Sequence, residues 1–360
     1  MKIKIAYLIS TLGTGGAEKQ LVRTINLLDF DKFEVSLFVL TGVNELQNEL
    51  DSHVKVVYLN FQSYINPINH LKLIKSIKQF NPHLLHSVMF ASNLFSRIYK
   101  VFHPKVKVVN HIHGLGSWIK KPHIILDRLF LPYVNKIILV SEKSKLVRAN
   151  REKYPIEKMQ VIHNCVDTNL YKPARDNDNL SVVFGVACRL IPLKNVGFSI
   201  KIIKLLKNKG VNVKLKIAGD GTELNSLISL VDKLKMNEYV EFDGLVQDMP
   251  KFYNQIDYLI SSSKIEDLPL TIVEALACGK VFISSNVGGI SELTTETDSF
   301  LFNIEDDLNK ISDEIIAFIA SIDKKSANFK NREFVLKNFS EKNHKDSISQ
   351  LYFELVKNGQ

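Results

Sequence analysis

The chain alternates short apolar segments with amphipathic segments in two successive series, and this alternation constrains its fold more than any other feature. Apolar stretches of roughly four to eight residues are typical of buried strands, and apolar residues at helical spacing fill the intervals. Strands that alternate with helices form parallel sheets covered on both faces. The first series predicts strands at residues 3–9, 33–40, 54–59, 84–87, 106–110 and 137–141, with helices at 17–28, 68–80, 91–101 and 142–153. The second predicts strands at residues 182–187, 213–218, 240–242, 258–261 and 281–284, with a helix in each interval.

A polar segment, Tyr171–Asn179, separates the two series and predicts a linker. A chain of 360 residues is long for one core, because a domain usually contains about 100–200 residues. We therefore predict an α/β protein with two Rossmann-like domains that face each other across a cleft. Ligands of such sheets bind beyond the carboxyl ends of the strands, so the cleft is the expected site.

Composition excludes several classes of protein. No apolar run approaches the roughly 20 residues that span a bilayer. The opening segment, Met1–Ser10, has no cleavage-like site and predicts a strand, not a signal peptide. Cys165, Cys188 and Cys278 have no metal-like spacing. They predict reduced core thiols and a cytoplasmic protein.

The net charge of +9 is held by the first half of the chain. Residues 1–170 contain 23 Lys and Arg against 12 Asp and Glu, and the remainder contains 24 against 26. A basic half favours an anionic partner such as a phospholipid surface or a phosphorylated lipid carrier. No nucleic-acid-binding signature is present, which argues against nucleic acid. Attachment to an anionic membrane would be electrostatic, helped by an apolar residue such as Trp118, and a solvated basic face is the alternative.

Two glutamates eight residues apart flank a predicted helix start in the second half. Pro269 suits the first turn of this helix and Gly279 its end. Glu266 then lies on the preceding loop, and Glu274 lies in the second turn. The free N–H groups of about residues 270–272 favour a phosphate at the helix start. The carboxylates would repel that phosphate but accept hydrogen bonds from sugar hydroxyls, which fits a nucleotide sugar. Taken singly, each glutamate is also explained as a solvated acid.

Two further loops follow predicted strands and carry groups that suit a diphosphate. Gly15 and Gly16 open the first helix, where glycine lets a ligand approach the backbone. The third glycine and the acid of a dinucleotide site are missing, so nicotinamide binding is disfavoured. Arg189 and Lys194 follow the strand at 182–187, where two cations could neutralise a departing diphosphate. Taken alone, the glycine loop is as often an ordinary turn, and an arginine and a lysine occur on many α/β loops without a ligand.

The segment 261–279 resembles the signature of retaining GT-B glycosyltransferases of family four, two glutamates separated by seven residues. The resemblance continues at residues 284–293, similar to a Gly-Gly-x-x-Glu-Leu turn, and at residues 185–195, similar to Gly-Arg-Leu-x-x-x-Lys-Asn. Asp267 stands where a glycine is usual in the donor-sugar loop, so the donor sugar stays open. The resemblance implies a GT-B fold and transfer of a sugar from a nucleotide donor.

The resemblance also assigns roles to individual residues. It places the diphosphate near Arg189 and Lys194, and the donor sugar near Glu266. Glu274, Leu270 and Thr271 would hold the nucleotide. The remaining assignments are Gly15 and Gly16 near the diphosphate and acceptor, Gly219, Gly221 and Val246 near the base and ribose, and His113 near the reacting carbon.

The resemblance further implies how the chain is divided and what it does. Residues 1–172 would bind the acceptor, residues 173–335 the nucleotide sugar, and residues 336–360 would form a helical tail that crosses back to the first domain. The predicted activity is a retaining transfer of a hexose to a glycan or lipid-linked acceptor in the synthesis of cell-surface polysaccharide or glycoconjugate. A nucleotide-sugar epimerase of GT-B type and a non-catalytic module that binds nucleotide or a membrane surface are the alternatives.

No metal or other cofactor is expected. Asp29 with Asp31, and Asp176 with Asp178, imitate the Asp-x-Asp motif by which another glycosyltransferase fold holds a divalent ion. The first pair follows a helix at the sheet edge opposite the expected site, and the second pair lies in the linker. Both are interpreted as turn residues. Arg189 and Lys194, with the helix dipole, would replace the ion.

Overall fold

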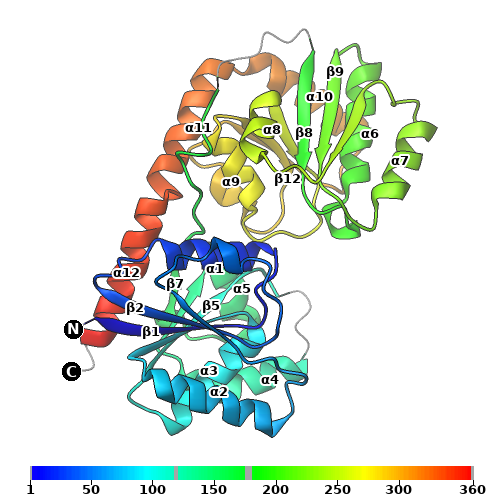
Figure 1. Ribbon diagram of the computed structural model, residues 1–360. Helices are drawn as coiled ribbons and strands as arrows, with labels where there is room; N and C mark the ends of the chain where they lie inside the picture. Colours follow the sequence, from blue (N-terminus) through cyan, green and yellow to red (C-terminus); the bar gives the residue numbers. More distant parts are fainter. Residues whose placement is uncertain (1, 117–120, 175–180, 358–360) are drawn as a thin grey trace. The chain divides into compact units, whose positions relative to one another are not determined.

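The computed structural model describes residues 2–116, 121–174 and 181–357. The chain divides into two compact units (Figure 1). Unit 1 comprises Met1–Cys165 with Glu341–Gln360, and unit 2 comprises Val166–Ser340. The division falls between Cys165 and Val166, whereas the sequence places it after residue 172. Each unit contains one parallel sheet between helices, so the predicted α/β class with two Rossmann-like domains is confirmed.

Unit 1 is built on a seven-stranded sheet of order β3-β2-β1-β4-β5-β6-β7, parallel throughout. The direction of winding reverses between β1 and β4, and ligands of open α/β sheets bind at such a switch point. The strands are β1 Ile3–Ile9, β2 Phe33–Val39, β3 Lys55–Tyr58, β4 Leu84–Val88, β5 Lys107–Ile112, β6 Lys136–Leu139 and β7 Met159–Val161.

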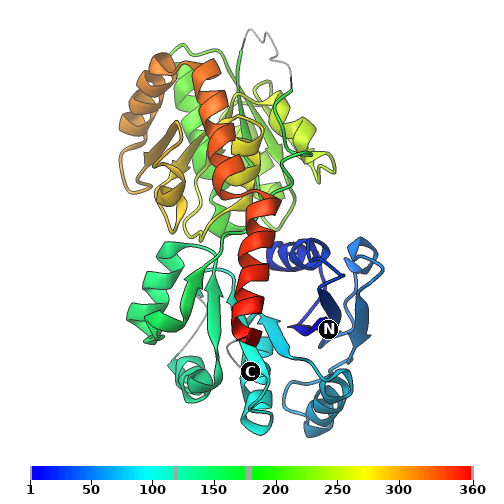
Figure 2. The ribbon, with the colours of Figure 1, turned by 90° about the vertical axis from the view of Figure 1, so that its left-hand side faces the viewer.

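Helices cover both faces of this sheet (Figures 1 and 2). Buried side chains of α1 and α12 form one core with β1 and β2, and those of α2 and α3 form another on the opposite face. The helices of unit 1 are α1 Gly16–Asn26, α2 Pro67–Phe80, α3 Phe90–Phe102, α4 Lys121–Phe130, α5 Glu142–Val147 and α12 Glu341–Lys357.

Helix α12, although last in the sequence, is part of unit 1. The buried Tyr352 hydroxyl lies 2.6 Å from the Tyr7 hydroxyl of β1 and 2.5 Å from Nδ1 of His86 on β4. Near the other end of α12, Nε2 of His344 lies 2.8 Å from the Thr24 hydroxyl of α1. Because these polar groups are buried, their hydrogen bonds fix the position of α12 along the sheet.

Unit 2 repeats the same winding with six parallel strands, in the order β10-β9-β8-β11-β12-β13. Its switch point lies between β8 and β11. The strands are β8 Val182–Ala187, β9 Val213–Ala218, β10 Val240–Gly244, β11 Tyr258–Ser261, β12 Val281–Ser285 and β13 Ser299–Phe302. The helices are α6 Val196–Asn208, α7 Leu224–Lys233, α8 Met249–Gln255, α9 Leu270–Ala277, α10 Leu308–Ser321 and α11 Lys324–Asn338.

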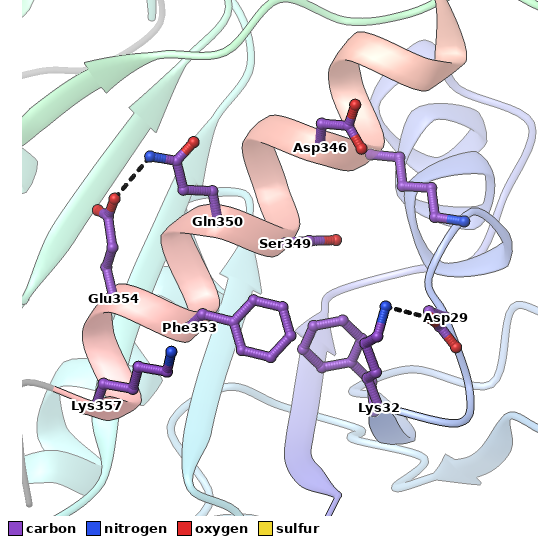
Figure 3. A pocket seen from close by; sticks show the side chains of 10 residues that line it. Asp29, Lys32, Asp346, Ser349, Gln350, Phe353, Glu354 and Lys357 are labelled. Atoms are coloured by element: carbon purple, nitrogen blue, oxygen red, sulfur yellow. Dashed lines mark hydrogen bonds and ion pairs between the residues drawn. The ribbon is translucent and has the colours of Figure 1, made fainter.

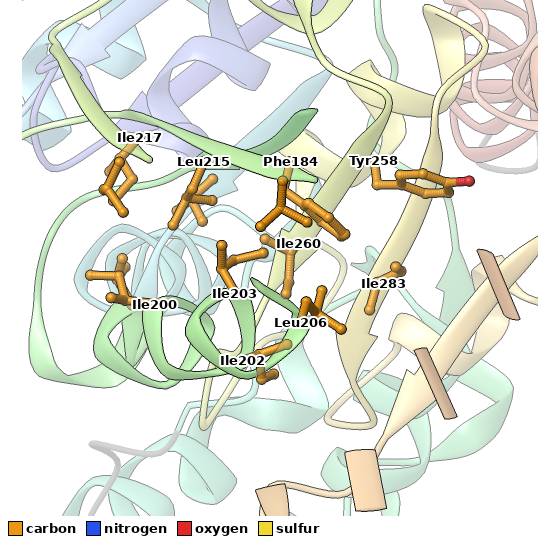
Figure 4. Packing of buried hydrophobic residues seen from close by; sticks show 14 of the residues in the cluster. Phe184, Ile200, Ile202, Ile203, Leu206, Leu215, Ile217, Tyr258, Ile260 and Ile283 are labelled. Carbon is orange, nitrogen blue, oxygen red and sulfur yellow. The ribbon is translucent and has the colours of Figure 1, made fainter. Parts of the chain in front are cut away.

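The core of unit 2 forms where α6 packs on the sheet (Figure 4). Ile200, Ile203 and Leu206 lie at helical spacing on one side of α6 and meet Phe184 and Leu215 of β8 and β9. All five side chains are fully buried. Burial of a side chain of this size contributes about 1.5–3 kcal/mol to folding stability. The packing of α6 on the sheet therefore stabilises the strands whose loops carry the site.

The structure also contains elements that the sequence periodicity did not predict. These include β7, β13, α4 and α10; the two strands have three and four residues, most of them only half-buried. The helix predicted at 142–153 is divided, because α5 ends at Val147 and a π-helical turn, Arg148–Glu152, follows. Within the described ranges, no helix combines the length and apolar character needed to cross a bilayer.

Candidate active site

Two predicted site residues meet at the switch point of unit 2. Lys194 ends the 3-10 turn Pro192–Lys194 after β8, and Glu266 lies on the loop between β11 and α9. Nζ of Lys194 forms an ion pair with Oε1 of Glu266, and the Ser263 hydroxyl donates to the same oxygen over 2.8 Å. The lysine and glutamate side chains are 23% and 13% exposed, so the pair is shielded from water but reachable. A cation and a carboxylate therefore share one position at the carboxyl ends of β8 and β11.

The two loops that carry this pair are joined by short hydrogen bonds. The Ser262 hydroxyl donates to the Asn195 carbonyl over 2.7 Å, and the Lys264 amide donates to the Leu193 carbonyl over 2.8 Å. The Ser285 hydroxyl at the end of β12 donates to the Ser263 carbonyl over 2.7 Å. These bonds hold the ion pair in place before any ligand arrives, which is the preorganisation that electrostatic catalysis needs.

Glycines permit the closest approaches between loops. Gly219 has a φ of +144°, and a Cβ there would lie 1.9 Å from the carbonyl oxygen of Cys188. A Cβ on Gly221 would lie 2.4 Å from the carbonyl oxygen of Leu190. The Cys188 amide donates to the Ala218 carbonyl over 3.1 Å, so the loops after β8 and β9 are in backbone contact. These close approaches explain why glycine is required at both positions. The location of both glycines near the nucleotide base stays a prediction.

A second close approach supports the Glu266 loop from the side of β12. Gly288 has a φ of +61°, and a Cβ there would lie 1.7 Å from the Glu266 carbonyl oxygen. The amide of Gly289 donates to the carbonyl of Asp267 over 2.7 Å. The Gly-Gly turn seen in the sequence therefore shapes the backbone around Glu266.

The start of α9 offers fewer free donors than the sequence suggests. Pro269 is the N-cap residue, not part of the first turn. Its carbonyl accepts a hydrogen bond from the Ile272 amide over 3.1 Å. Within the described part of the chain, the N–H groups of Leu270 and Thr271 have no such partner and remain available to an anion.

Glu274 lies in the second turn of α9, as predicted, and a buried tyrosine orients it. The Tyr253 hydroxyl on α8 donates to Oε2 of Glu274 over 2.8 Å. Burial, and then the nearby Glu274 charge, raise the pKa of Tyr253 well above its usual value, so the hydroxyl remains a donor. Tyr253 is part of the site that sequence reasoning missed, because nothing in the spacing of these residues signals the contact.

Three other predicted residues have plainer surroundings. Arg189 is exposed on the loop after β8, separate from the Lys194–Glu266 pair. Val246 is half-buried against the core under α8 and α9. Cys188 directly precedes Arg189, and burial raises the pKa of its thiol to about 12, so the thiol is protonated at neutral pH.

The glycine loop of unit 1 carries carboxylates. Gly15 caps α1 and Gly16 is its first residue. Oε1 of Glu18 accepts a hydrogen bond from the Thr11 hydroxyl over 3.0 Å, and Oε2 of Glu45 accepts one from the Thr14 amide over 3.1 Å. A phosphate at this helix start would be repelled by two carboxylates, whereas a sugar hydroxyl would find acceptors. Of the two predicted ligands, the acceptor suits this loop better than the diphosphate.

His113 follows β5 and ends a row of histidine rings. Its ring centroid lies 4.2 Å from that of His111, which lies 5.5 Å from that of His86. Burial lowers the pKa of His113 to about 4 and that of His86 to about 3. His113 is therefore neutral at pH 7, able to donate or accept a hydrogen bond but not to act as a cation.

The loop after His113 is held by two arginines of the π-helical turn. Arg148 donates to the Gly114 carbonyl over 3.1 Å, and Arg151 donates to the carbonyls of Leu115 and Gly116 over 3.1 and 3.0 Å. The buried Glu152 carboxylate pairs with both guanidinium groups. Sequence reasoning treated this segment as an ordinary helix and missed these contacts.

A groove of about 600 Å³ lies elsewhere in unit 1, between α12 and the start of β2 (Figure 3). Asp29 pairs with Lys32 at 2.8 Å on its rim, and Oδ1 of Asp29 accepts a hydrogen bond from the Asp31 amide. Asp29 thus stabilises its own turn at the amino end of the sheet. Asp176 and Asp178 lie outside the described residues. Among the described residues, no cluster of three or more His, Cys, Asp or Glu could hold a metal ion.

Comparison with known proteins divides the chain close to the boundary between the two units. Residues 170–333 match the family described as Glycosyl transferases group 1, and residues 14–170 match Glycosyltransferase Family 4. Among curated proteins, the chain is 24% identical to the UDP-Gal:alpha-D-GlcNAc-diphosphoundecaprenol alpha-1,3-galactosyltransferase of Escherichia coli, over 99% of this chain and 98% of that protein. It is also 24% identical to the capsular polysaccharide biosynthesis glycosyltransferase CapH of Staphylococcus aureus, over 84% and 87%.

Solved structures share the fold over nearly the whole chain. Anabaena HepE in complex with UDP superposes with a TM-score of 0.85 at 20% identity, covering 98% of this chain and all of that one. A glycosyltransferase from Rickettsia africae gives a TM-score of 0.85 at 21% identity, covering 99% of both. The two family matches, which together span residues 14–333, and these similarities identify the chain as a member of the group 1 glycosyltransferases with the GT-B fold.

Proposed function

We propose that this glycosyltransferase moves a hexose from a nucleoside diphosphate donor to a hydroxyl of a glycan or lipid-linked acceptor, with retention of configuration, in cell-surface polysaccharide or glycoconjugate synthesis. The observation that carries the proposal is the Lys194–Glu266 pair beside the free N–H groups of α9. The names of the relatives support it, since the E. coli protein uses UDP-Gal and a diphosphoundecaprenol-linked acceptor, and the S. aureus protein acts in capsular polysaccharide biosynthesis. HepE was solved with UDP and with UDP-glucose.

In this proposal the donor binds across the start of α9. The amides of Leu270 and Thr271 donate to the diphosphate, and the helix dipole adds about half a positive charge. Lys194 turns from Glu266 toward the phosphate oxygens, which frees the carboxylate to accept hydrogen bonds from sugar hydroxyls. Glu274, oriented by Tyr253, accepts from the ribose.

The same residues suggest how the glycosidic bond breaks. The leaving diphosphate gains negative charge, and Lys194, with Arg189 from the same loop, stabilises that charge in the transition state. In this proposal Glu266 accepts hydrogen bonds from the sugar hydroxyls and Glu274 from the ribose, so neither glutamate is assigned to attack the reacting carbon. We therefore favour attack by the acceptor from the side of the leaving group. His113, neutral at pH 7, would accept or donate a hydrogen bond near the reacting carbon, a role that rests on the resemblance.

Two further properties belong to this proposal. Lys194, Arg189 and the start of α9 would neutralise the diphosphate, so a divalent ion would be unnecessary. A cytoplasmic location, with peripheral attachment to an anionic membrane, is also part of the proposal. The location would suit cysteines outside disulfides, and Cys165 and Cys278 are buried and form no disulfide.

The test begins with binding of UDP, GDP and ADP by calorimetry, followed by mass spectrometry of candidate lipid-linked acceptors incubated with the matching sugar donors. A glycosylated acceptor whose new bond keeps the donor's anomeric configuration by NMR is the expected result. Activity should survive EDTA. Formation of an epimer from the nucleotide sugar alone would favour the epimerase, and activity lost with EDTA and restored by manganese would contradict metal independence.

A further inference from the structure

The row of rings that ends at His113 begins at the last helix of the chain. Residues two apart on a strand lie on one face of a sheet, so His111 of β5 shares a face with His113 just after it. The parallel register pairs His111 with Val88 of β4, which places His86, two residues before Val88, diagonal to His111. This is the face of the sheet that α12 covers through Tyr352 (Figure 2).

His86 is held by one hydrogen bond and by two tyrosine rings. The Tyr352 hydroxyl lies 2.5 Å from its Nδ1, the Tyr7 ring stacks on it at a centroid distance of 4.9 Å, and the Tyr352 ring meets it edge-on. All three side chains are fully buried. Both hydroxyl protons find an acceptor only if Tyr7 donates to Tyr352 over 2.6 Å and Tyr352 donates to Nδ1 of His86. The neutral His86 ring then carries its proton on Nε2.

His111 is positioned by neighbouring rings. Its centroid lies 5.5 Å from that of His86 and 4.2 Å from that of His113. Nε2 of His86 and Nε2 of His111 are buried, and neither has a hydrogen-bond partner in the described part of the chain. Unpaired polar atoms in a core cost stability, so apolar residues would fill both positions more favourably. Stability alone therefore does not explain the two imidazoles.

The His113 ring takes its orientation from His111. His113 is half-buried, and among residues 2–116, 121–174 and 181–357 its nitrogens form no hydrogen bond and its ring contacts only that of His111. A ring with a single such contact can rotate when that contact moves. The proposed function puts this ring near the reacting carbon, where a displacement of about 1 Å can lower the rate about a hundredfold.

All three imidazoles of the row are neutral at pH 7. Burial is the largest cause that lowers the pKa values of His86, His111 and His113 below the usual value. Neutral rings pack against one another without charge repulsion. The row therefore keeps one geometry near neutral pH.

We propose that Tyr352 of α12 is a positioning residue for the transfer reaction, which acts on His113 through the rings of His86 and His111. The Tyr352 hydroxyl sets the rotation of His86, His86 sets the place of His111, and His111 sets the orientation of His113. The inference rests on the proposed function, because it uses the role of His113 near the reacting carbon.

The variant Y352F tests the first contact, and Y7F is its matched control. Each removes one buried hydroxyl, keeps the ring and breaks the bond between the two tyrosines, but only Y352F breaks the bond to His86. Both variants should be less stable than wild type in urea. Y352F should lower kcat about tenfold with the KM of the nucleotide sugar unchanged, because placement and not binding is altered. Y7F should keep the wild-type kcat. Turnover is measured as release of UDP from UDP-galactose or UDP-glucose, with the acceptor identified by mass spectrometry or with water.

A pair of substitutions tests the ring contact of His111. H111A removes the ring, and H111F keeps a ring against His113. H111A should lower kcat by about tenfold or more with KM unchanged, and H111F should restore it to within about threefold of wild type. A merely structural role would make the loss of kcat follow the loss of stability, whereas a positioning role makes it follow the presence of the ring.

A spectroscopic measurement on the ligand-free protein needs no substrate. In protein labelled with ¹⁵N-histidine, ring nitrogen shifts report which nitrogen of each imidazole carries the proton. The signals of His113 are identified by their loss in H113A. We expect His86 to be protonated on Nε2 in wild type and Y7F. The His113 signals should shift in Y352F and H111A, and they should stay in place in Y7F.

Several results would overturn the inference. These are a wild-type kcat in Y352F, a loss in Y7F as large as that in Y352F, unchanged His113 signals in Y352F, or an H111F variant as slow as H111A. H113A separates this inference from the proposed function. A slow H113A beside a Y352F of wild-type rate contradicts the inference alone, whereas a wild-type kcat in H113A contradicts the role of His113 in the proposed function.

Discussion

The Lys194–Glu266 pair predicts that substitutions of the two residues partly cancel each other in their effect on nucleotide affinity. In the ligand-free protein each charge compensates the other. In the proposed complex, Lys194 attracts the diphosphate and Glu266 repels it. Replacing Lys194 by methionine removes the attraction and also leaves a carboxylate, only 13% exposed, without its partner.

The size of the effect follows from this geometry. Two unit charges about 4 Å apart interact by about 4 kcal/mol at an effective dielectric constant of about 20. Partial exposure of Lys194 reduces this interaction energy. We therefore expect K194M to raise the dissociation constant of the nucleoside diphosphate about a hundredfold, which corresponds to about 2.7 kcal/mol. Glu266→Gln should leave that constant within about threefold of wild type, because the cation remains, while turnover of the sugar donor falls about tenfold or more.

The double variant K194M/E266Q is the informative one. Without the repelling carboxylate, its dissociation constant should rise only about tenfold, so the second substitution restores part of what the first removes. The corresponding interaction energy, about 1.4 kcal/mol, is within the usual range for residues in contact. Isothermal titration calorimetry of all three variants measures it. Lys324→Met is the matched control, since Lys324 pairs with Asp257 over 2.9 Å at the amino end of β11. A double variant that binds as weakly as K194M would refute the reasoning.

Three further predictions concern other contacts. Glu274→Ala should weaken nucleoside diphosphate binding by about 1.5–3 kcal/mol in calorimetry, and Tyr253→Phe by less, because Tyr253 only orients Glu274; equal affinity in wild type and E274A would contradict the ribose role. Arg151→Ala should lower turnover more than nucleotide affinity, because it releases the backbone after His113, and unchanged kcat would leave this contact purely structural. Burial depresses the pKa of His86 to about 3, so its neutral form stabilises unit 1 above pH 6.5 and this contribution declines as pH falls toward 3. Urea unfolding should show about 2 kcal/mol lost from this group between pH 7 and 5, and a His86→Leu variant with the same pH slope would contradict it.

Much of the fold could be predicted from the sequence because parallel sheets are buried on both faces. Their strands are then continuous apolar runs, and the predicted limits of β1, β8, β9 and β11 agree with the structure. The meeting of Lys194 with Glu266 was foreseeable for the same reason. Both residues follow strands, and neighbouring parallel strands end at one edge of the sheet. β7 and β13 escaped prediction because most of their side chains are only half-buried, so neither strand forms the continuous apolar run that marks the similarly short β11.

Other parts of the site depended on tertiary structure. The hydroxyl of Tyr253 reaches Glu274 only because α8 and α9 pack together, and Arg151 reaches the loop after His113 only because a π-helical turn redirects it. Sequence spacing records the period of each element but not the rotation of one helix against its neighbour. Helix α12 shows the same limit, since the bond between Tyr352 and Tyr7 joins residues that are 345 positions apart. Periodic burial is a local property of the chain, whereas contacts between side chains require that separate elements already be packed in three dimensions.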